Sequence, residues 1–263
     1  MSVATSAVRS PEPRRKGRNI VTIASGKGGV GKTWLAITLS HALARAGART
    51  LLFDADLGLA NVDIQLGLAP ERDLGSVIAG RRRLANAVIP FADGGFDLVA
   101  GRSGSGNLSA LHPMRLAALR DDLLDLAAGY DTVVVDLGAG LEQSVKLLTV
   151  DAGRCLVVCT DEPTALTDAY AFIKIMRLER PGLDLRVIVN MAAGKAEGER
   201  TYNTLRKVCE NFLSFTPPLA GTVRRDNRVR DAIRNQTALL TRHPGSPAAG
   251  DVERIAAALR SER

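Results

Sequence analysis

Aromatic residues, cysteine and long hydrophobic runs are all scarce in this sequence. Aromatic residues make up 4% of the chain, so the interior has to be built mainly from Ala, Leu, Val and Ile. The three cysteines and three histidines are scattered, and this spacing favours neither a disulfide framework nor a zinc-type metal site. No run approaches the ~18 apolar residues that a membrane span needs. We therefore expect neither a spanning helix nor a signal peptide, and we expect the protein in the cytoplasm.

Positive charge is concentrated at the start of the chain. Of the formal net charge of +7, +4 lies within residues 1–18, which also contain two prolines and no apolar run. Such a composition cannot bury enough apolar surface to fold. We predict a disordered basic tail over 1–18 and one folded domain over 19–263, in which strand and helix patterns alternate without a linker.

The stretch SGKGGVGKT, residues 25–33, places four glycines within nine residues. An apolar, β-branched run at 20–24 precedes it and an apolar helical run at 32–46 follows it. In this strand–loop–helix context, the pattern G-x-x-x-x-G-K-[ST] is typical of a phosphate-binding loop. Glycines let successive backbone N–H groups point into one concavity, and the N-terminus of the following helix adds the positive end of its dipole.

The loop therefore predicts a site for a nucleoside triphosphate with Mg²⁺. We expect Lys32 to contact the β- and γ-phosphates and the Thr33 hydroxyl to ligate the metal ion. The residues predicted to bind the nucleotide here are Gly26, Lys27, Gly28, Gly29, Val30, Gly31, Lys32, Thr33 and Trp34.

Carboxylates follow two further predicted strands. Asp54 and Asp56 come directly after a strand at 50–53, and Asp136 ends a continuously apolar run at 131–136. Such a run is typical of a central parallel strand buried on both faces. Because ligands bind at the carboxyl ends of parallel strands, we expect these acids at the nucleotide site. We predict that Asp136 holds a Mg²⁺-bound water.

The rest of the chain continues the alternation. A segment at 161–168 begins a helix that we expect to reach Arg180, with Thr164 or Thr167 as its cap. The run Arg81, Arg82, Arg83 is interpreted as a solvated face. Further strands are predicted at 96–100, 154–160, 185–189 and 219–223, and further helices at 73–79, 112–128, 198–212, 227–235 and 251–259. This alternation predicts an α/β fold with a mainly parallel sheet covered by helices on both faces.

The two lysines of K-G-G-V-G-K-T, Lys27 and Lys32, make this loop resemble that of the deviant Walker A ATPases, the MinD/ParA group of P-loop NTPases. The resemblance implies a single doubly wound, mainly parallel sheet and slow, partner-regulated ATP hydrolysis. It also implies an ATP-dependent homodimer, in which Lys27 reaches the nucleotide of the partner subunit.

The same resemblance assigns roles to residues that match the motifs of the group. Asp56 would orient the attacking water, Asp54 would belong to the Mg²⁺ shell, and Asn190 would read the adenine edge, for which its amide offers a donor and an acceptor. The predicted catalytic residues are thus Lys27, Lys32 and Asp56, the metal-site residues are Thr33, Asp54 and Asp136, and the base-binding residue is Asn190.

Within the group, the segments 54–68 and 162–174 look most like the FlhG/FleN branch of flagellar-number regulators. This implies flagellar or other positioning proteins as partners. A ParA-type partition ATPase remains an alternative, because the arginines near 224–234 could grip DNA phosphates without sequence preference. A MinD-type regulator of the division site and an interaction module that binds ATP without turnover remain open too.

Membrane attachment is not expected, because the last helix carries a short apolar stripe that we assign to the sheet. A peripheral place at the cell pole or inner membrane is left open.

Overall fold

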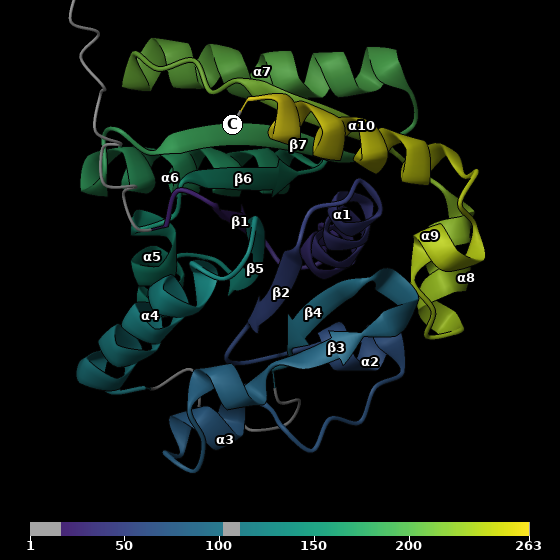
Figure 1. Cartoon of the computed structure of the whole chain (residues 1–263). Coiled ribbons are helices and arrows are strands. Elements are labelled where there is room, and N and C mark those ends of the chain that lie inside the picture. Colours follow the sequence, from purple (N-terminus) through teal and green to yellow (C-terminus); the bar gives the residue numbers. More distant parts are fainter. Residues whose placement is uncertain (1–16, 102–110, 263) are drawn as a thin grey trace, which may run out of the picture.

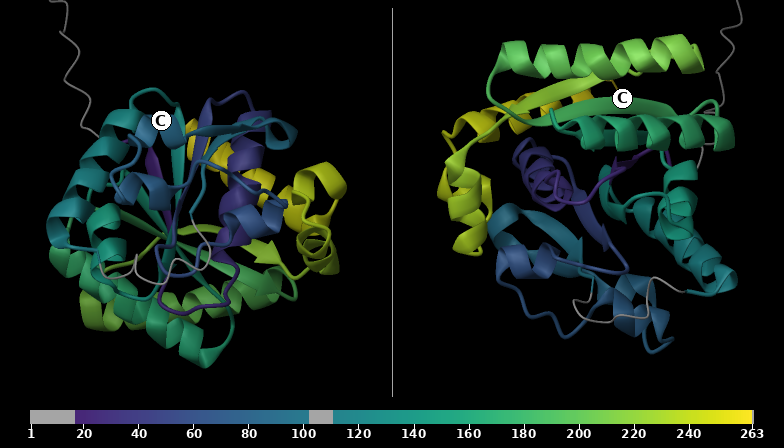
Figure 2. Two further views of the ribbon diagram at one scale, coloured as in Figure 1. Left: turned by 90° about the horizontal axis from the view of Figure 1, so that it is seen from below. Right: turned by 180° about the vertical axis from the view of Figure 1, so that it is seen from behind.

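The computed structural model describes residues 17–101 and 111–262. These residues form one eight-stranded sheet in the order β3-β4-β2-β5-β1-β6-β7-β8, with helices on both faces (Figures 1 and 2). All neighbouring strands are parallel except β3, which runs antiparallel to β4 at one edge. The predicted doubly wound, mainly parallel sheet is confirmed. Of the predicted basic tail, residues 1–16 lie outside the described part.

The central strands are buried on both sides, as their continuous apolar sequence requires. In β5, for example, Val133 and Val135 join the core on one face of the sheet and Val134 joins the core on the other. The strands are β1 (Ile20–Ser25), β2 (Thr50–Ala55), β3 (Ile89–Phe91), β4 (Phe96–Val99), β5 (Thr132–Ala139), β6 (Arg154–Cys159), β7 (Asp184–Ala192) and β8 (Leu219–Arg224).

Two hydrophobic cores separate the helices into two layers. One core includes residues of α3, α4, α5, α6 and α7, and the other includes residues of α1, α2, α8, α9 and α10. The helices are α1 (Lys32–Arg45), α2 (Val62–Leu66), α3 (Leu74–Ile78), α4 (Pro113–Ala127), α5 (Gln143–Val150), α6 (Pro163–Glu179), α7 (Lys195–Leu213), α8 (Asn227–Arg234), α9 (Leu239–Arg242) and α10 (Pro247–Ser261), with short 3-10 helices η1 (Leu84–Ala87) and η2 (Ala92–Gly94).

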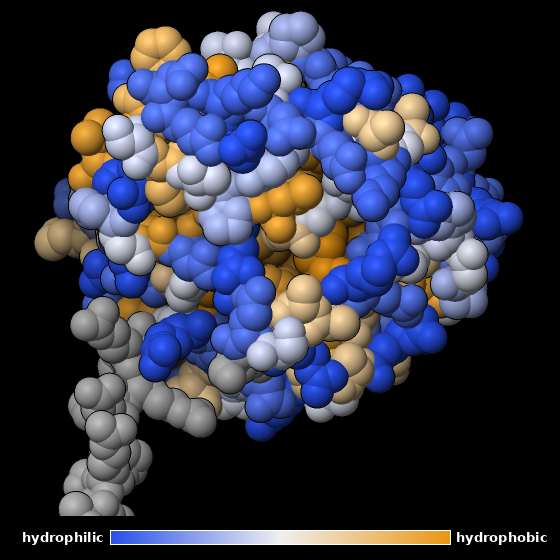
Figure 3. All heavy atoms as spheres, turned by 90° about the horizontal axis from the view of Figure 1, so that it is seen from above, coloured by the Kyte–Doolittle hydropathy of each residue, from blue (hydrophilic) through white to orange (hydrophobic). Residues whose placement is uncertain are grey.

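The last helix packs as expected. Its apolar side, with Val252, Ile255 and Leu259, is buried in the core beside α1, and the side chain of Ile255 lies against Gly221 of β8. In the part of the chain that the structure covers, no helix is both long and apolar enough to cross a membrane. The outer face over α7 is mainly hydrophilic, with hydrophobic side chains gathered in the hollows (Figure 3).

The predicted cap of α6 is wrong. Glu162 occupies the N-cap position and makes no side-chain cap bond. Thr167 instead donates to the Pro163 carbonyl one turn earlier, and the Thr164 hydroxyl accepts a hydrogen bond from Lys27. The Thr164 side chain, which local sequence suggests as a helix cap, instead contacts Lys27 of the phosphate loop.

Candidate functional site

A pocket of about 520 Å³ opens at the carboxyl edge of the sheet. The phosphate loop and the start of α1 form one wall, and the segments that follow β2 and β5 form others. The lining residues are Gly28, Gly29, Gly31, Lys32, Thr33, Trp34, Ala55, Asp56, Leu57, Gly58, Leu59, Asn61, Gln65, Gly138, Ala139, Glu142, Ser144, Met191 and Ile233. This is the place where parallel α/β sheets bind their ligands.

The loop backbone explains why glycines are needed. Gly29 and Gly31 have φ angles of 81° and 89°, a left-handed conformation that side chains disfavour. Gly26 is required for a different reason, because a Cβ atom there would lie 2.2 Å from the Asp168 carbonyl oxygen. The Ser25 hydroxyl donates to the Lys27 carbonyl oxygen at 2.6 Å and helps to fix the turn.

Lys32 is the cation of the pocket. It is the first residue of α1 and is buried, although it lines the pocket. Burial lowers the pKa of its ammonium group, while the nearby carboxylates of Asp136 and Asp56 oppose that shift. A cation that is partly stripped of water attracts an anionic ligand more strongly than a solvated one does.

Two carboxylates lie side by side beneath the loop. Asp54 of β2 and Asp136 of β5 are partners in the register of the two strands, and both are buried, at 0% and 1% exposure. Asp54 accepts hydrogen bonds from the backbone N–H groups of Asp56 and Val62, both at 3.2 Å. Neither oxygen of Asp136 has a hydrogen-bond partner of normal geometry among the described residues, although the Thr33 hydroxyl lies close enough to act on the carboxyl.

This arrangement penalises ionisation. Burial, above all, raises the pKa of Asp136 to about 7, while the Thr33 hydroxyl and the charge of the Lys32 ammonium group act to lower it. Burial and the Asp136 charge hold the pKa of Asp54 well above its ordinary value. Two buried carboxylates on neighbouring strands are costly to ionise together unless a cation shares them.

A magnesium ion fits these groups. The orphaned oxygens of Asp136 lie beside Thr33, and hydroxyl and carboxylate oxygens are the ligands that Mg²⁺ prefers. Mg²⁺ in nucleotide sites is held by one or two protein oxygens, with phosphates and water completing the shell, so a full cage of protein ligands is not required. Asp54 would act through Asp136, its neighbour in the sheet.

Asp56 and Trp34, both predicted site residues, line the pocket. One oxygen of Asp56 accepts from the N–H groups of Gly58 and Leu59, at 3.2 and 2.9 Å, and the carboxylate faces Gly138 near the end of β5. The buried indole N–H of Trp34 donates to no described residue. The water-orienting role of Asp56 and the nucleotide contact of Trp34 stay predictions.

Lys27 and Asn190 do not line the pocket. The ammonium group of Lys27 points to the start of α6, where it contacts Glu162 and Thr164. Asn190, in β7, is 2% exposed and lies behind the loop, where its amide contacts the backbone of Val30 and Met191. Contact of either side chain with nucleotide stays a prediction.

Some lining residues were not predicted. Glu142 and Ser144 stand at the start of α5, Gln65 lies in α2 and Ile233 in α8. No motif marks these positions, since they come from α2, α5 and α8 and only the tertiary fold brings them to one pocket. Met191 had one available signal, because it directly follows Asn190 at the end of a predicted strand.

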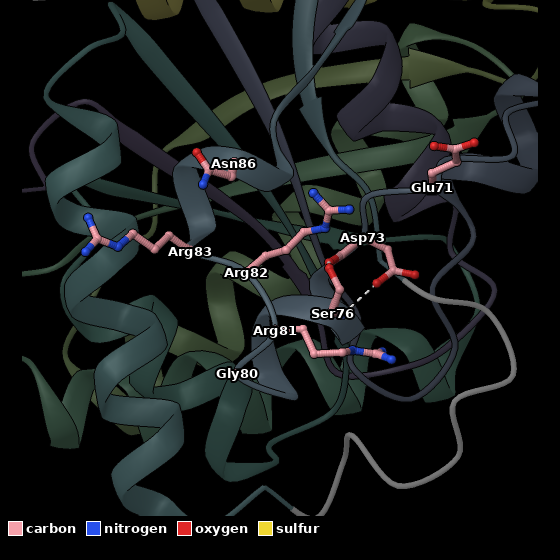
Figure 4. A pocket seen from close by; sticks show the side chains of 8 residues that line it. All are labelled: Glu71, Asp73, Ser76, Gly80, Arg81, Arg82, Arg83 and Asn86. Atoms are coloured by element: carbon pink, nitrogen blue, oxygen red, sulfur yellow. Dashed lines mark hydrogen bonds between the residues drawn. The ribbon is translucent and has the colours of Figure 1, made fainter.

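A larger hollow of about 830 Å³ lies around α3 and the loop that follows it. Arg81, Arg82 and Arg83 line it, and their side chains splay apart instead of converging on one point (Figure 4). A hydrogen bond from the Ser76 N–H to Asp73 caps α3. The three arginines are exposed, as the interpretation of this run as a solvated face requires.

Comparisons with known proteins agree with this geometry. Residues 21–239 match the family described as "CobQ/CobB/MinD/ParA nucleotide binding domain". The antiactivator FleN of Pseudomonas aeruginosa is 40% identical over 229 residues, which cover 87% of this chain and 81% of that protein. The flagellum site-determining protein YlxH of Helicobacter pylori is 31% identical over 244 residues, 92% of this chain and 82% of that one.

Solved structures share the fold. The cell division ATPase MinD of Pyrococcus furiosus superposes with a TM-score of 0.79 at 23% identity, and covers 93% of this chain and 99% of that one. MinD of Pyrococcus horikoshii, complexed with Mg-ADP, gives a TM-score of 0.78 at 24% identity and covers 92% and 95%. The resemblance to the MinD/ParA group and to its FlhG/FleN branch is confirmed.

Proposed function

Since the chain belongs to the CobQ/CobB/MinD/ParA family of nucleotide-binding proteins, we propose that it is a magnesium-dependent ATPase whose nucleotide state controls flagellar number or placement through protein partners. The observation that carries the nucleotide site is the buried, unpartnered carboxylate of Asp136 beneath a glycine-shaped phosphate loop. The similarity to FleN and YlxH supports the flagellar process.

Each residue of the pocket has a role that follows from its position. The N–H groups of the loop glycines and the ammonium of Lys32 bind the phosphate chain. Thr33 and Asp136 hold Mg²⁺, which neutralises charge on the β- and γ-phosphate oxygens. Asp56, at the rim between the segments after β2 and β5, orients the attacking water. We expect slow turnover, because these groups position and stabilise charge but include no strong base.

We also propose that the protein dimerises on ATP, and the position of Lys27 supports this. Lys27 lies outside the pocket of its own chain and is bound to Glu162, so it would reach a nucleotide in a second copy once that contact opens. ATP would then shift the population toward a dimer, and the dimer would differ from the monomer in its affinity for partners.

Trp34 provides the assay for nucleotide binding. It is the single tryptophan of the chain and it lines the pocket, so its emission should change when Mg-ATP binds. Lys32→Ala should abolish both this change and phosphate release. Asp56→Ala should still bind ATP but accumulate as a dimer at saturating ATP in light scattering. A wild-type protein with no affinity for adenine nucleotides in the presence of magnesium would refute the proposal.

The flagellar process has its own test. Deletion of the gene should change the number or position of flagella, and a plasmid copy carrying Lys32→Ala should not restore them. Normal flagella in the deletion strain would refute the flagellar role but would not contradict the proposed ATPase activity.

DNA binding is a second candidate function. Arg225, Arg228, Arg230 and Arg234 are exposed on and beside α8, and none forms an ion pair with a described carboxylate. Arg224 has to be removed from the predicted basic surface, because it forms a two-pronged ion pair with the buried Asp251 at 2.8 and 2.9 Å. ATP-dependent, salt-sensitive retention on random duplex DNA would favour this function. No retention at low salt would exclude it.

A further inference from the structure

Asn190 is tied to the phosphate loop by a buried hydrogen bond. Its side-chain N–H donates to the carbonyl oxygen of Val30 at 2.8 Å, and its side-chain oxygen accepts from the Met191 N–H at 2.9 Å. The bond joins Asn190, near the end of β7, to Val30, which lies two residues before the start of α1. Asn190 is 2% exposed and Val30 3%, so water does not compete for the bond.

The bond fixes the orientation of one peptide unit. In a trans peptide the C=O and the following N–H point in opposite directions. The Val30 carbonyl is held on the buried side by Asn190, so the N–H of Gly31 is turned to the opposite side, and Gly31 lines the pocket. No described residue accepts a hydrogen bond from that N–H.

Gly31 is shaped by the same contact. A Cβ atom at this position would lie 2.5 Å from the Asn190 side-chain nitrogen, and the residue has a φ angle of 89°. A side chain would therefore displace the amide as well as strain the backbone. Gly31 and Asn190 are thus packed as one unit behind the phosphate site.

We propose that Asn190 is a positioning residue of the phosphate loop, which aims the Gly31 N–H at the phosphate chain independently of any contact with the base. The inference rests on the proposed nucleotide-binding function. It adds to the predicted adenine contact without requiring it, because an amide has two N–H groups and two lone pairs and the loop contact uses one of the N–H groups.

A ligand without a base separates the two roles. The probe is inorganic tripolyphosphate with Mg²⁺, compared with Mg-ATP in competition for the same site. Asn190→Leu preserves the approximate volume and adds no charge, but it frees the Val30 carbonyl. We expect the dissociation constants of both ligands to rise about tenfold, the size expected for a misdirected hydrogen bond to an anion. Their ratio should stay within about twofold.

Asn19→Leu is the matched control. Asn19 also donates to part-buried backbone, at 2.7 Å to the Ala127 carbonyl and 2.9 Å to that of Tyr130, but it lies at the opposite end of β1 from the loop. This variant should lose stability in thermal unfolding while it keeps both affinities. If Asn19→Leu weakened binding of the two ligands as much as Asn190→Leu, the effect of Asn190→Leu would be explained by general destabilisation and the inference would fail.

A measurement on the wild-type chain covers the case in which Asn190→Leu does not fold. In wild-type protein labelled with ¹⁵N-glycine, the Gly31 amide proton should move downfield when tripolyphosphate binds. Where Asn190→Leu does fold, this shift should shrink or vanish in the variant. No downfield shift in the wild type would overturn the inference. So would an Asn190→Leu variant that loses ATP but keeps tripolyphosphate, because Asn190 would then act on the base alone. Wild-type protein that binds neither ligand would refute the proposed function itself.

Discussion

The ammonium group of Lys27 lies 2.7 Å from the carboxylate of Glu162 and 2.8 Å from the hydroxyl of Thr164. The first lysine of the loop is therefore bound at the start of α6 in its own chain. That hydrogen bond also lowers the pKa of Glu162. If Lys27 serves a partner subunit, this contact has to open first.

Glu162→Gln should make ATP-dependent dimerisation easier. The variant removes the charge that holds Lys27, and an exposed ion pair of this kind is worth only a small factor, so we expect the dimer dissociation constant to fall about two- to fivefold. Analytical ultracentrifugation at saturating ATP measures it. Glu199→Gln is the control, because Glu199 pairs with Lys195 on the exposed surface of α7. A weaker Glu162→Gln dimer would mean that Glu162 itself belongs to the interface.

Lys27→Ala and Lys32→Ala should fail in different ways. Lys32 lies in the pocket, so its loss should weaken ATP binding by about a hundredfold or more, as expected for a charged hydrogen bond to phosphate in a buried site. Lys27 lies outside, so Lys27→Ala should keep ATP affinity within a few-fold but lose dimerisation and phosphate release. Fluorescence of Trp34 and light scattering separate the two steps. Hydrolysis by monomeric Lys27→Ala would contradict the role in the partner subunit.

Asp136→Asn should stabilise the nucleotide-free protein at alkaline pH. The folded-state pKa of about 7 lies above the ordinary value of 3.8, so the folded chain binds this proton more tightly than the unfolded chain. The contribution of the carboxyl to stability is present in acid and is lost as the pH rises from about 4 through about 7. At pH 8 we expect the free energy of unfolding to rise by about 2 kcal/mol in the variant.

Urea unfolding at pH 8 and pH 5 measures this difference, which should shrink at the lower pH. The further stabilisation that Mg-ATP gives the wild type should be absent from Asp136→Asn, since the metal site is lost. A variant that is less stable than the wild type at pH 8 would show that Asp136 has a structural partner in the free protein.

His41 should make the fold sensitive to mild acid. Burial, together with Arg45, lowers the pKa of its ring to about 4 from 6.5, while Asp93 opposes the shift, and its Nδ1 has no described partner. The neutral ring therefore contributes stability above pH 6.5 that is lost as the pH falls toward 4, because the unfolded chain takes up the proton first. Over that interval His41→Gln should lose about 2 kcal/mol less than the wild type. Unfolding curves of the wild type and the variant at several pH values measure this.

Local pattern predicted most of the elements. The continuous valines of β5 and the glycine loop between β1 and α1 can be recognised in the sequence, because each is determined by residues close in the chain. The edge strand β3 was not predicted, since it has three residues and includes Pro90, which is tolerated at a sheet edge but resembles a turn in sequence. The helix α5 was not predicted either, and it spans only Gln143–Val150.

By itself, the sequence determined that a phosphate loop follows the first strand and that Asp54 and Asp136 stand at the carboxyl ends of two further strands, which the structure extends past both residues. Both facts depend on short-range backbone preferences and on burial. Only the tertiary structure decided which residues are partners. It places Asp54 beside Asp136 on neighbouring strands, pairs Lys27 with Glu162 and Arg224 with Asp251, and joins Asn190 to the Val30 carbonyl by a hydrogen bond. These pairs join segments far apart in the chain. Sheet order and helix packing bring them together, and no spacing within one segment encodes that order.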